Sequence, residues 1–187
     1  MTVKSNILII GSTGRNTGKT EFACRIIEKH SAQKEIIGVK VIPVDKNEGN
    51  CHRGDEGCGL CDSLTGDYEI IEETTVDSSK DTSRMLKAGA QKVYLLIVDR
   101  NSLEKGINAV LRMIPDNALL VIESNSIRKV IEPGLFIVIK NLMNNSVKQS
   151  CAEVIIFADK IIGFNKMNWD FNPDKVLILN ERWMIKE

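Results

Sequence analysis

The sequence predicts an α/β protein, a three-layer sandwich in which helices cover both faces of a mostly parallel sheet. Short and nearly continuous apolar segments recur along the 187 residues, which is typical of strands buried on both faces of a parallel sheet. Segments with helical spacing separate them and give the crossover length that parallel strands need. The length suits a single domain with a sizeable core.

Strand and helix patterns alternate in the first half of the chain. A strand over residues 7–10 precedes a helix, whose apolar face carries Ala23, Ile26, Ile27 and His30. A second strand covers residues 36–42 and is expected to stop at Pro43, which has no N–H to donate. Residues 45–67 are polar and show no helical period, and residues 68–72 alternate like a half-exposed strand.

The second half continues this alternation. A short helix over residues 81–90 is ended by Gly89, and a buried strand over 93–98 runs into Asp99. Asn101 and Glu104 resemble a capping box that opens a helix reaching Pro115. Strands follow over residues 119–122 and 135–139, then a helix with apolar positions from 151 to 158, and two late strands over 161–164 and 176–179.

The connection between the first strand and the first helix is glycine-rich and has the layout of a phosphate-binding P-loop. Small residues let backbone N–H groups surround a phosphate, Lys19 can reach the β- and γ-phosphates, and the Thr20 hydroxyl can ligate Mg²⁺. The following helix adds unpaired N–H groups and a positive dipole end. The expected nucleotide-binding residues here are Gly14, Arg15, Asn16, Thr17, Gly18, Lys19, Thr20 and Glu21.

The loop departs from the strict P-loop spacing. That spacing places a glycine at Thr13, whereas the glycines stand at Gly11 and Gly14. We therefore expect a loop that is longer than the simplest form or bent differently.

Ligands of such sheets bind beyond the carboxyl ends of the strands, so polar residues after each strand are candidate site residues. Glu123 ends an apolar strand, where NTPases place a carboxylate that holds Mg²⁺ or orients water. Asp99 is a second candidate catalytic acid. Lys40 interrupts an apolar strand, which costs desolvation unless an anion meets it; a lysine reaching to solvent from a strand end is the alternative. Asp45 follows the same strand.

Composition narrows the partners. The chain has 25 Lys and Arg residues and 25 Asp and Glu residues, so its formal net charge is zero. A charge near zero does not indicate binding to nucleic acid or to a membrane surface. No apolar run approaches the roughly 20 residues that cross a bilayer, and the amino terminus carries no secretion signal. We expect a cytoplasmic protein.

A cysteine cluster distinguishes the chain from a plain NTPase. Cys51, Cys58 and Cys61 have Cys-x₆-Cys-x₂-Cys spacing within a polar insert over residues 45–75. Such a cluster can bind Zn²⁺ or an iron–sulfur cluster with a fourth ligand, for which His52, Asp62 or a partner subunit are candidates. Structural or redox thiols are the alternative. We expect one domain over residues 1–187 with this insert projecting from it.

Several segments together resemble the molybdopterin-guanine dinucleotide biosynthesis protein B group of P-loop proteins. They are the loop 11–20, the strand residues 38–40, the segment 81–90, the turn 122–126 and residues 158–160. The dethiobiotin synthetase and nitrogenase-iron-protein-like superclass is more distantly similar. The resemblance covers about residues 5–165 and implies GTP binding, slow hydrolysis, a homodimer and a maturation partner in molybdenum cofactor biosynthesis.

The base preference stays open between GTP and ATP. The turn Asn165-Lys166-Met167-Asn168 resembles an Asn-Lys-x-Asp guanine-binding turn. However, Asn168 replaces the acid that accepts two ring N–H protons, and an amide can accept only part of that pattern.

Three functions fit these observations. The first is a nucleotide-hydrolysing accessory protein for metal-cofactor maturation, with Mg²⁺ held by Thr20 and Glu123. The second is a small-molecule kinase or ligase of the dethiobiotin synthetase type, in which Lys40 and Asp45 contact the substrate. The third is a non-catalytic, nucleotide-gated binding module.

Overall fold

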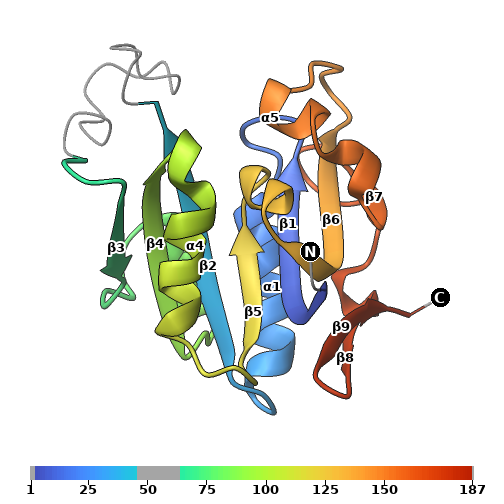
Figure 1. Ribbon diagram of the computed structural model, residues 1–187. Coiled ribbons are helices and arrows are strands. Elements are labelled where there is room, and N and C mark those ends of the chain that lie inside the picture. Colours follow the sequence, from blue (N-terminus) through green and yellow to red (C-terminus); the bar gives the residue numbers. More distant parts are fainter. Residues whose placement is uncertain (1–2, 46–63, 187) are drawn as a thin grey trace.

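The centre of the molecule is a seven-stranded sheet. The computed structural model describes residues 3–45 and 64–186, and the strand order is β3-β4-β2-β5-β1-β6-β7 (Figure 1). All neighbours are parallel except β3, which runs antiparallel to β4. The predicted α/β class with a mostly parallel sheet is therefore confirmed. The strands are β1 (Val3–Ser12), β2 (Ile36–Val44), β3 (Tyr68–Glu72), β4 (Lys92–Asp99), β5 (Leu119–Glu123), β6 (Glu132–Asn141) and β7 (Lys160–Phe164).

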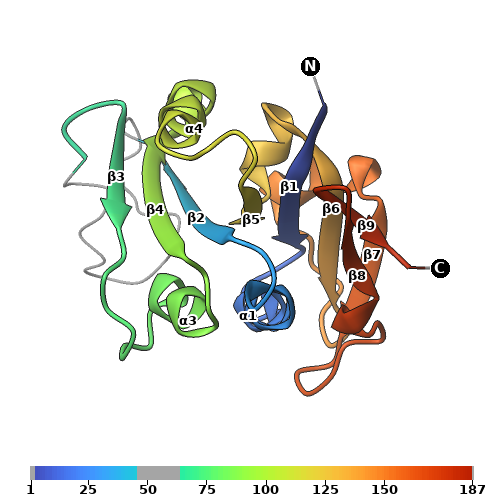
Figure 2. The same ribbon diagram turned by 90° about the horizontal axis from the view of Figure 1, so that it is seen from below.

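Both faces of the sheet are covered. Helices α1 (Lys19–Ser31) and α3 (Asp81–Lys87) lie on one face, and α4 (Leu103–Arg112) lies on the other (Figure 2). The hairpin of β8 (Val176–Leu179) and β9 (Arg182–Ile185) packs on the α1 side. The short helix α5 (Gln149–Ala152) packs on the α4 side. The 3₁₀ turns are η1 (Arg100–Ser102), η2 (Ser126–Lys129), η3 (Ile155–Phe157) and η4 (Pro173–Lys175).

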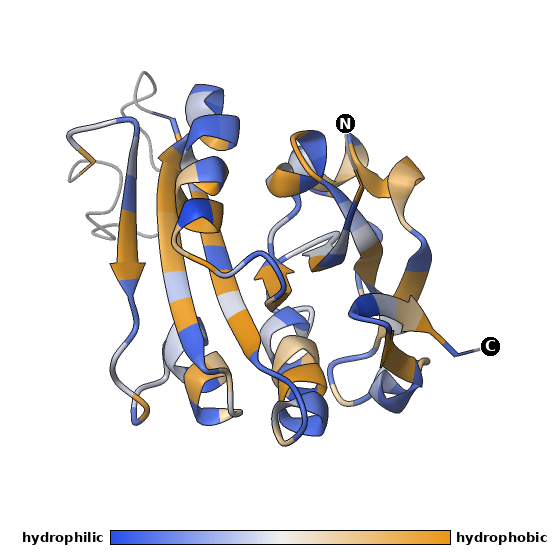
Figure 3. Ribbon diagram, turned by 60° about the horizontal axis from the view of Figure 1, so that its bottom comes forward, coloured by the Kyte–Doolittle hydropathy of each residue, from blue (hydrophilic) through white to orange (hydrophobic). Residues whose placement is uncertain are grey.

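The strand pattern explains the two apolar cores. Successive residues of β1 point to opposite faces: Ile7 and Ile9 join the core under α4, and Leu8 and Ile10 join the core under α1. A strand buried on both sides has no polar face to show, so its sequence is continuously apolar. The strands are accordingly hydrophobic over most of their length (Figure 3).

The expected stop of the second strand at Pro43 is wrong. Strand β2 continues to Val44, and Pro43 stands opposite Val98 of β4. The physical reason is that β5 ends at Glu123, opposite Lys40. Beyond that point β2 pairs with β4 only, so the missing N–H of proline can face the open side.

The predicted capping box is also wrong. A 3₁₀ turn precedes α4, and the residue before the helix, Ser102, makes no side-chain cap. The carboxylate of Asp99 instead accepts the N–H of Asn101 at 2.9 Å. Asp99 therefore caps the 3₁₀ turn, and α4 begins only after that turn.

The carboxyl-terminal region differs from the expectation in two further ways. The helix expected from 151 to 158 is only α5 followed by η3. The late strand 176–179 is β8, which leaves the central sheet and pairs antiparallel with β9. Trp183 of β9 anchors the hairpin by donating its indole N–H to the carbonyl of Asn6 at 3.0 Å.

The two ends of the predicted insert meet at one edge of the sheet. Val44 stands opposite Asp99 at the end of β4, and Tyr68, which starts β3, stands opposite the neighbouring Val98. Leu64 is buried beside Val44. Residues 68–72 of the predicted insert thus belong to the sheet, whereas Cys51, Cys58 and Cys61 lie outside the described residues.

Gly134 of β6 provides a test of how closely the strands pack. A Cβ at this position would lie 2.3 Å from the carbonyl oxygen of Ser5 in β1, and backbone cannot move away cheaply. We expect Gly134→Ala to lower the free energy of unfolding by about 1–3 kcal/mol in urea denaturation. Gly66→Ala is the control, because its Cβ would meet only the Tyr68 carbonyl at 3.9 Å. Equal stability of the two variants would contradict this packing.

Candidate functional site

The loop between β1 and α1 is fixed at its start by the side chain of Asn125. The Asn125 amide accepts the N–H of Ser12 at 2.7 Å and donates to the Ser12 carbonyl at 2.9 Å. It therefore pairs with Ser12 as a neighbouring strand would. Gly11 permits this approach, since a Cβ there would lie 2.5 Å from the Asn125 oxygen.

Thr13 replaces the glycine of the strict spacing and has a structural role. Its N–H donates to Ile139 at 3.0 Å, its hydroxyl accepts the N–H of Asn141 at 3.1 Å, and its carbonyl accepts the N–H of Lys148 at 2.9 Å. The side chain is buried, with 1% exposed. Thr13 thus ties the loop to the connection that follows β6, and its φ is not among the positive ones.

The second half of the loop presents backbone donors. Asn16 and Gly18 have φ of 50° and 69°, a local alternation of the kind that turns successive N–H groups toward one side. Among the hydrogen bonds of the described residues, none uses the N–H of Asn16, Thr17 or Gly18. The first N–H groups of α1 have no partner within the helix either. Donors of this kind at the start of a helix are suited to an anion.

Three side chains converge beyond the loop on the carboxylate of Glu123, which is 2% exposed. The Thr20 hydroxyl donates to Glu123 Oε2 at 2.7 Å. The ammonium of Lys19 lies 3.9 Å from Glu123 Oε1 and 3.5 Å from the Gly14 carbonyl. The structure therefore brings together the hydroxyl, the lysine and the acid that the sequence singled out.

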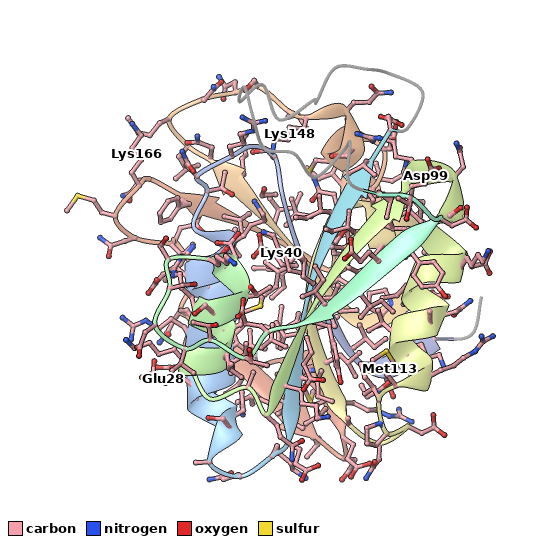
Figure 4. All side chains as sticks on the ribbon, turned by 90° about the vertical axis from the view of Figure 1, so that its left-hand side faces the viewer. Glu28, Lys40, Asp99, Met113, Lys148 and Lys166 are labelled. Carbon is pink, nitrogen blue, oxygen red and sulfur yellow. The ribbon has the colours of Figure 1, made fainter. Side chains whose placement is uncertain are left out.

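Lys40 is the third partner of Glu123. It donates to Glu123 Oε1 and also lies 2.8 Å from Oδ2 of Asp81, at the start of α3. The Lys40 side chain is only 14% exposed, and it lies near the centre of the view in Figure 4. Two carboxylates thus offset the cost of placing this ammonium inside the fold.

The environment shifts the pKa values of two groups in this cluster. The pKa of Lys19 is lowered from 10.5 to about 8, mainly by burial; Glu123 opposes the shift, and the nearby Lys40 and Lys148 contribute to it. Partial burial would raise the pKa of Asp81, but Lys40, with smaller contributions from Thr20 and Arg84, holds it below its usual value. The two carboxylates and two ammonium groups together are formally neutral.

A second ion pair joins α3 to α1. Arg84 donates to Oε2 of Glu21 at 2.6 Å, and Arg25 lies 3.6 Å from the other oxygen of the same carboxylate. Glu21, predicted to bind the nucleotide, links the two helices through its side chain. Its backbone N–H still belongs to the first turn of α1.

Asp99 and Asp45 lie farther along the sheet. Lys40 and Val44 of β2 stand opposite Leu95 and Asp99 of β4, so Asp99 is four residues, or about 13 Å, beyond the level of Lys40. Figure 4 shows this separation. Asp99 caps η1, and Asp45 lies 2.5 Å from Nε of Arg100. The described contacts do not join either acid to Lys19 or Glu123.

The turn after β7 uses its first amide locally. The oxygen of Asn165 accepts the N–H groups of Met167 and Asn168 at 3.0 and 2.8 Å, and Lys166 has φ of 76°. Trp169 follows, and its indole nitrogen lies 3.2 Å from where a Cβ of Gly18 would be. The turn thus lies beside the glycine-rich loop.

The oxygen atoms at the site fit Mg²⁺. The Thr20 hydroxyl and the carboxylates of Glu123 and Asp81 are hard donors, and Mg²⁺ in phosphate sites takes one or two carboxylates with water and phosphate. Within residues 3–45 and 64–186, no group of three or more His, Cys, Asp or Glu side chains is placed to hold a metal ion. The predicted zinc or iron–sulfur ligands are outside those ranges.

Comparisons with protein-family models, with curated proteins and with solved structures give no match to this chain. In the part of the chain that the structure describes, no helix combines the length and the apolar character needed to cross a bilayer.

Sequence reasoning did not include Asp81, Arg84 or Asn125 among the site residues. Asp81 opens a helix after a polar segment, which reads as an ordinary helix start. A partner for Lys40 was nevertheless implied, because a lysine inside an apolar strand requires an anion. Only the tertiary arrangement shows which acids supply it.

The lowered pKa of Lys19 predicts a pH-dependent stability. Between about pH 8 and 10.5 the unfolded chain still binds this proton while the folded chain releases it, so the free energy of unfolding should rise with pH. In Lys19→Met this contribution of about 1–3 kcal/mol should vanish. Urea unfolding at pH 7.5 and 9.5 measures it, with Lys34→Met, an exposed lysine on the same protein, as control. Parallel pH profiles of wild type and Lys19→Met would contradict the burial of a charged Lys19.

Proposed function

We propose that this chain is a P-loop protein that binds a nucleoside triphosphate with Mg²⁺. The observation that carries the proposal is the hydrogen bond of 2.7 Å from Thr20 to the buried Glu123, with Lys19 beside it at the start of α1. P-loop NTPases hold Mg²⁺ through a loop Ser or Thr and an acid at the end of a neighbouring strand. The unpaired loop amides supply the complementary phosphate site.

Each residue has a distinct role in this proposal. The N–H groups of residues 14–21 surround the β-phosphate, and Lys19 neutralises charge between the β- and γ-phosphates. Thr20, Glu123 and Asp81 would hold Mg²⁺, which when bound neutralises charge on the phosphate oxygens. Lys40 contacts both carboxylates and holds them in place before nucleotide arrives.

Hydrolysis in the proposed site is slow. Glu123 can orient a water molecule for attack on the γ-phosphate, but its two oxygens already accept from Thr20 and Lys40. A carboxylate shared in this way has fewer lone pairs left to orient a water molecule. The role in molybdenum or other metal-cofactor maturation, the homodimer and the client protein are part of the proposal through the sequence resemblance alone.

A small-molecule kinase is the second candidate. Lys40 lies next to the carboxylate oxygens of Asp81 and Glu123 that would hold Mg²⁺. This placement favours a kinase, because an ammonium group there can hold an anionic acceptor substrate. In this case Lys40 would exchange Asp81 for the substrate. Asp45, which pairs with Arg100, would not take part.

The first test is nucleotide binding by calorimetry with GTP and ATP in the presence of Mg²⁺. We expect Lys19→Ala to weaken binding by about 100-fold, because a charge-assisted contact to phosphate is lost. Lys34→Ala removes the same charge outside the site and should bind as wild type. Unchanged affinity in Lys19→Ala would exclude the P-loop proposal.

Product analysis then separates the candidate functions. A hydrolase is supported if the wild-type protein alone releases phosphate and the Glu123→Gln variant does not. Transfer to an added metabolite supports a kinase. Tight binding without phosphate above background supports a nucleotide-gated module.

Asp81 provides a second test. If Asp81 helps to hold Mg²⁺, Asp81→Asn should reduce the gain in nucleotide affinity on adding Mg²⁺ by about tenfold, and leave affinity in EDTA nearly unchanged. Asp77→Asn is the matched control, because Asp77 is a highly exposed acid in the segment before α3. An equal Mg²⁺ effect in the two variants would remove Asp81 from the metal site.

A further inference from the structure

A hollow of about 540 Å³ lies where the edge strand β7 meets the β8–β9 hairpin. It shares no lining residue with the candidate nucleotide site. Its volume falls within the range of about 300–1,000 Å³ that is usual for small-molecule sites. Its lining combines lysine side chains with apolar ones, which are described in turn.

Three lysines from different elements line the hollow. Lys160 starts β7, Lys175 belongs to η4, and Lys186 follows β9. The single acid in the lining is Asp170, and its Oδ1 already accepts the N–H of Gly163 at 2.7 Å. Among the described residues, none of the three lysines forms an ion pair with an acidic side chain. The lining therefore carries an excess of two positive charges.

Apart from the lysines and Asp170, the lining is apolar and partly aromatic. Phe171 is half-buried, and the Lys160 ammonium lies 5.8 Å from the centre of its ring. Ile161 is 49% exposed although it belongs to a strand of the central sheet. The Phe171 ring also packs against Phe22 of α1, with 6.5 Å between ring centres. An aromatic face next to ammonium groups suits a ligand that is both flat and anionic.

Backbone hydrogen bonds fix the walls. Asp170 donates its N–H to the Gly163 carbonyl at 3.0 Å, and Lys186 donates its N–H to the Lys175 carbonyl at 2.8 Å. The first holds the segment after β7 against that strand, and the second holds the end of β9 against η4. A hollow that is already formed loses little conformational entropy on binding.

We propose that this hollow binds a small organic anion that carries an aromatic ring. The ring lies on Phe171 and Ile161, and the anionic group contacts Lys160, Lys175 and Lys186. The concave shape and limited volume favour a small molecule over an extended polymer. This inference does not depend on nucleotide binding.

The test is titration of the ¹⁵N-labelled full chain with phenyl phosphate, followed by amide chemical shifts. We expect saturable shifts at residues 160–161, 170–171, 175 and 185–186, and weaker binding of both phenol and inorganic phosphate, each of which lacks one half of the ligand. The double variant Lys175→Ala/Lys186→Ala should bind about tenfold more weakly. Lys87→Ala/Lys105→Ala removes the same charge from α3 and α4 and should bind as wild type.

Three outcomes would overturn the proposal. They are the absence of saturable shifts, shifts confined to residues 14–21, and equal loss of affinity in the two double variants. The spectra also report whether each variant is folded, so a loss of binding through unfolding is recognised and replaced by the single variant Lys175→Ala. A nucleotide-binding defect in Lys19→Ala leaves this result unaffected.

Discussion

The buried carboxylate of Glu123 is the constraint on which the site depends. A charge with 2% exposure is tolerated only when it is paired and hydrogen-bonded. Its partners come from two other parts of the sheet: Thr20 and Lys19 follow β1, and Lys40 belongs to β2. The strand order places β5 between these two strands, and the register sets Glu123 opposite both Ile10 and Lys40. The sheet topology therefore assembles the cluster.

The same cluster connects the glycine-rich loop to α3. Lys40 bridges Glu123 and Asp81, and Arg84 of the same helix pairs with Glu21. Helix α3 is thus attached by charge both to β2, through Asp81 and Lys40, and to α1, through Arg84 and Glu21. Asp81, Arg84 and Glu21 are 39–46% exposed, so solvent screens these pairs more than it screens the buried contacts of Glu123.

Much of the fold follows from the sequence because its strands are buried on both faces. Continuous apolar segments such as 7–10 and 119–122 cannot be mistaken for exposed structure, and the glycine-rich loop indicates which strand end carries the site. The wrong predictions concern places where a neighbouring strand or side chain determines where a strand or helix begins or ends. Pro43 is accommodated because β5 stops short, and the helix expected from residue 101 is delayed because Asp99 caps a 3₁₀ turn.

The site shows the same division between local and distant information. Four residues of the cluster are predictable, because each ends the glycine-rich loop or interrupts or ends an apolar strand: Lys19, Thr20, Lys40 and Glu123. Asp81 and Asn125 are not, since their importance arises from contacts with residues more than 40 positions away. Thr13 is the instructive case. It departs from the glycine spacing, yet its buried hydroxyl accepts the N–H of Asn141, a hydrogen bond that a glycine could not make.

The convergence of Val44 and Tyr68 on the end of β4 has a consequence for how this protein can vary. A connection whose two ends flank the same strand, β4, can be lengthened or shortened without moving any strand, and each doubling of such a loop costs only about 0.6 kcal/mol of closure entropy. This part of the sheet is therefore a natural point for gaining or losing an accessory module. Val44 lies four residues, or about 13 Å, beyond Lys40 along β2, so a module grafted there begins at the same end of the sheet as Lys40 and Glu123 without replacing any residue of that cluster.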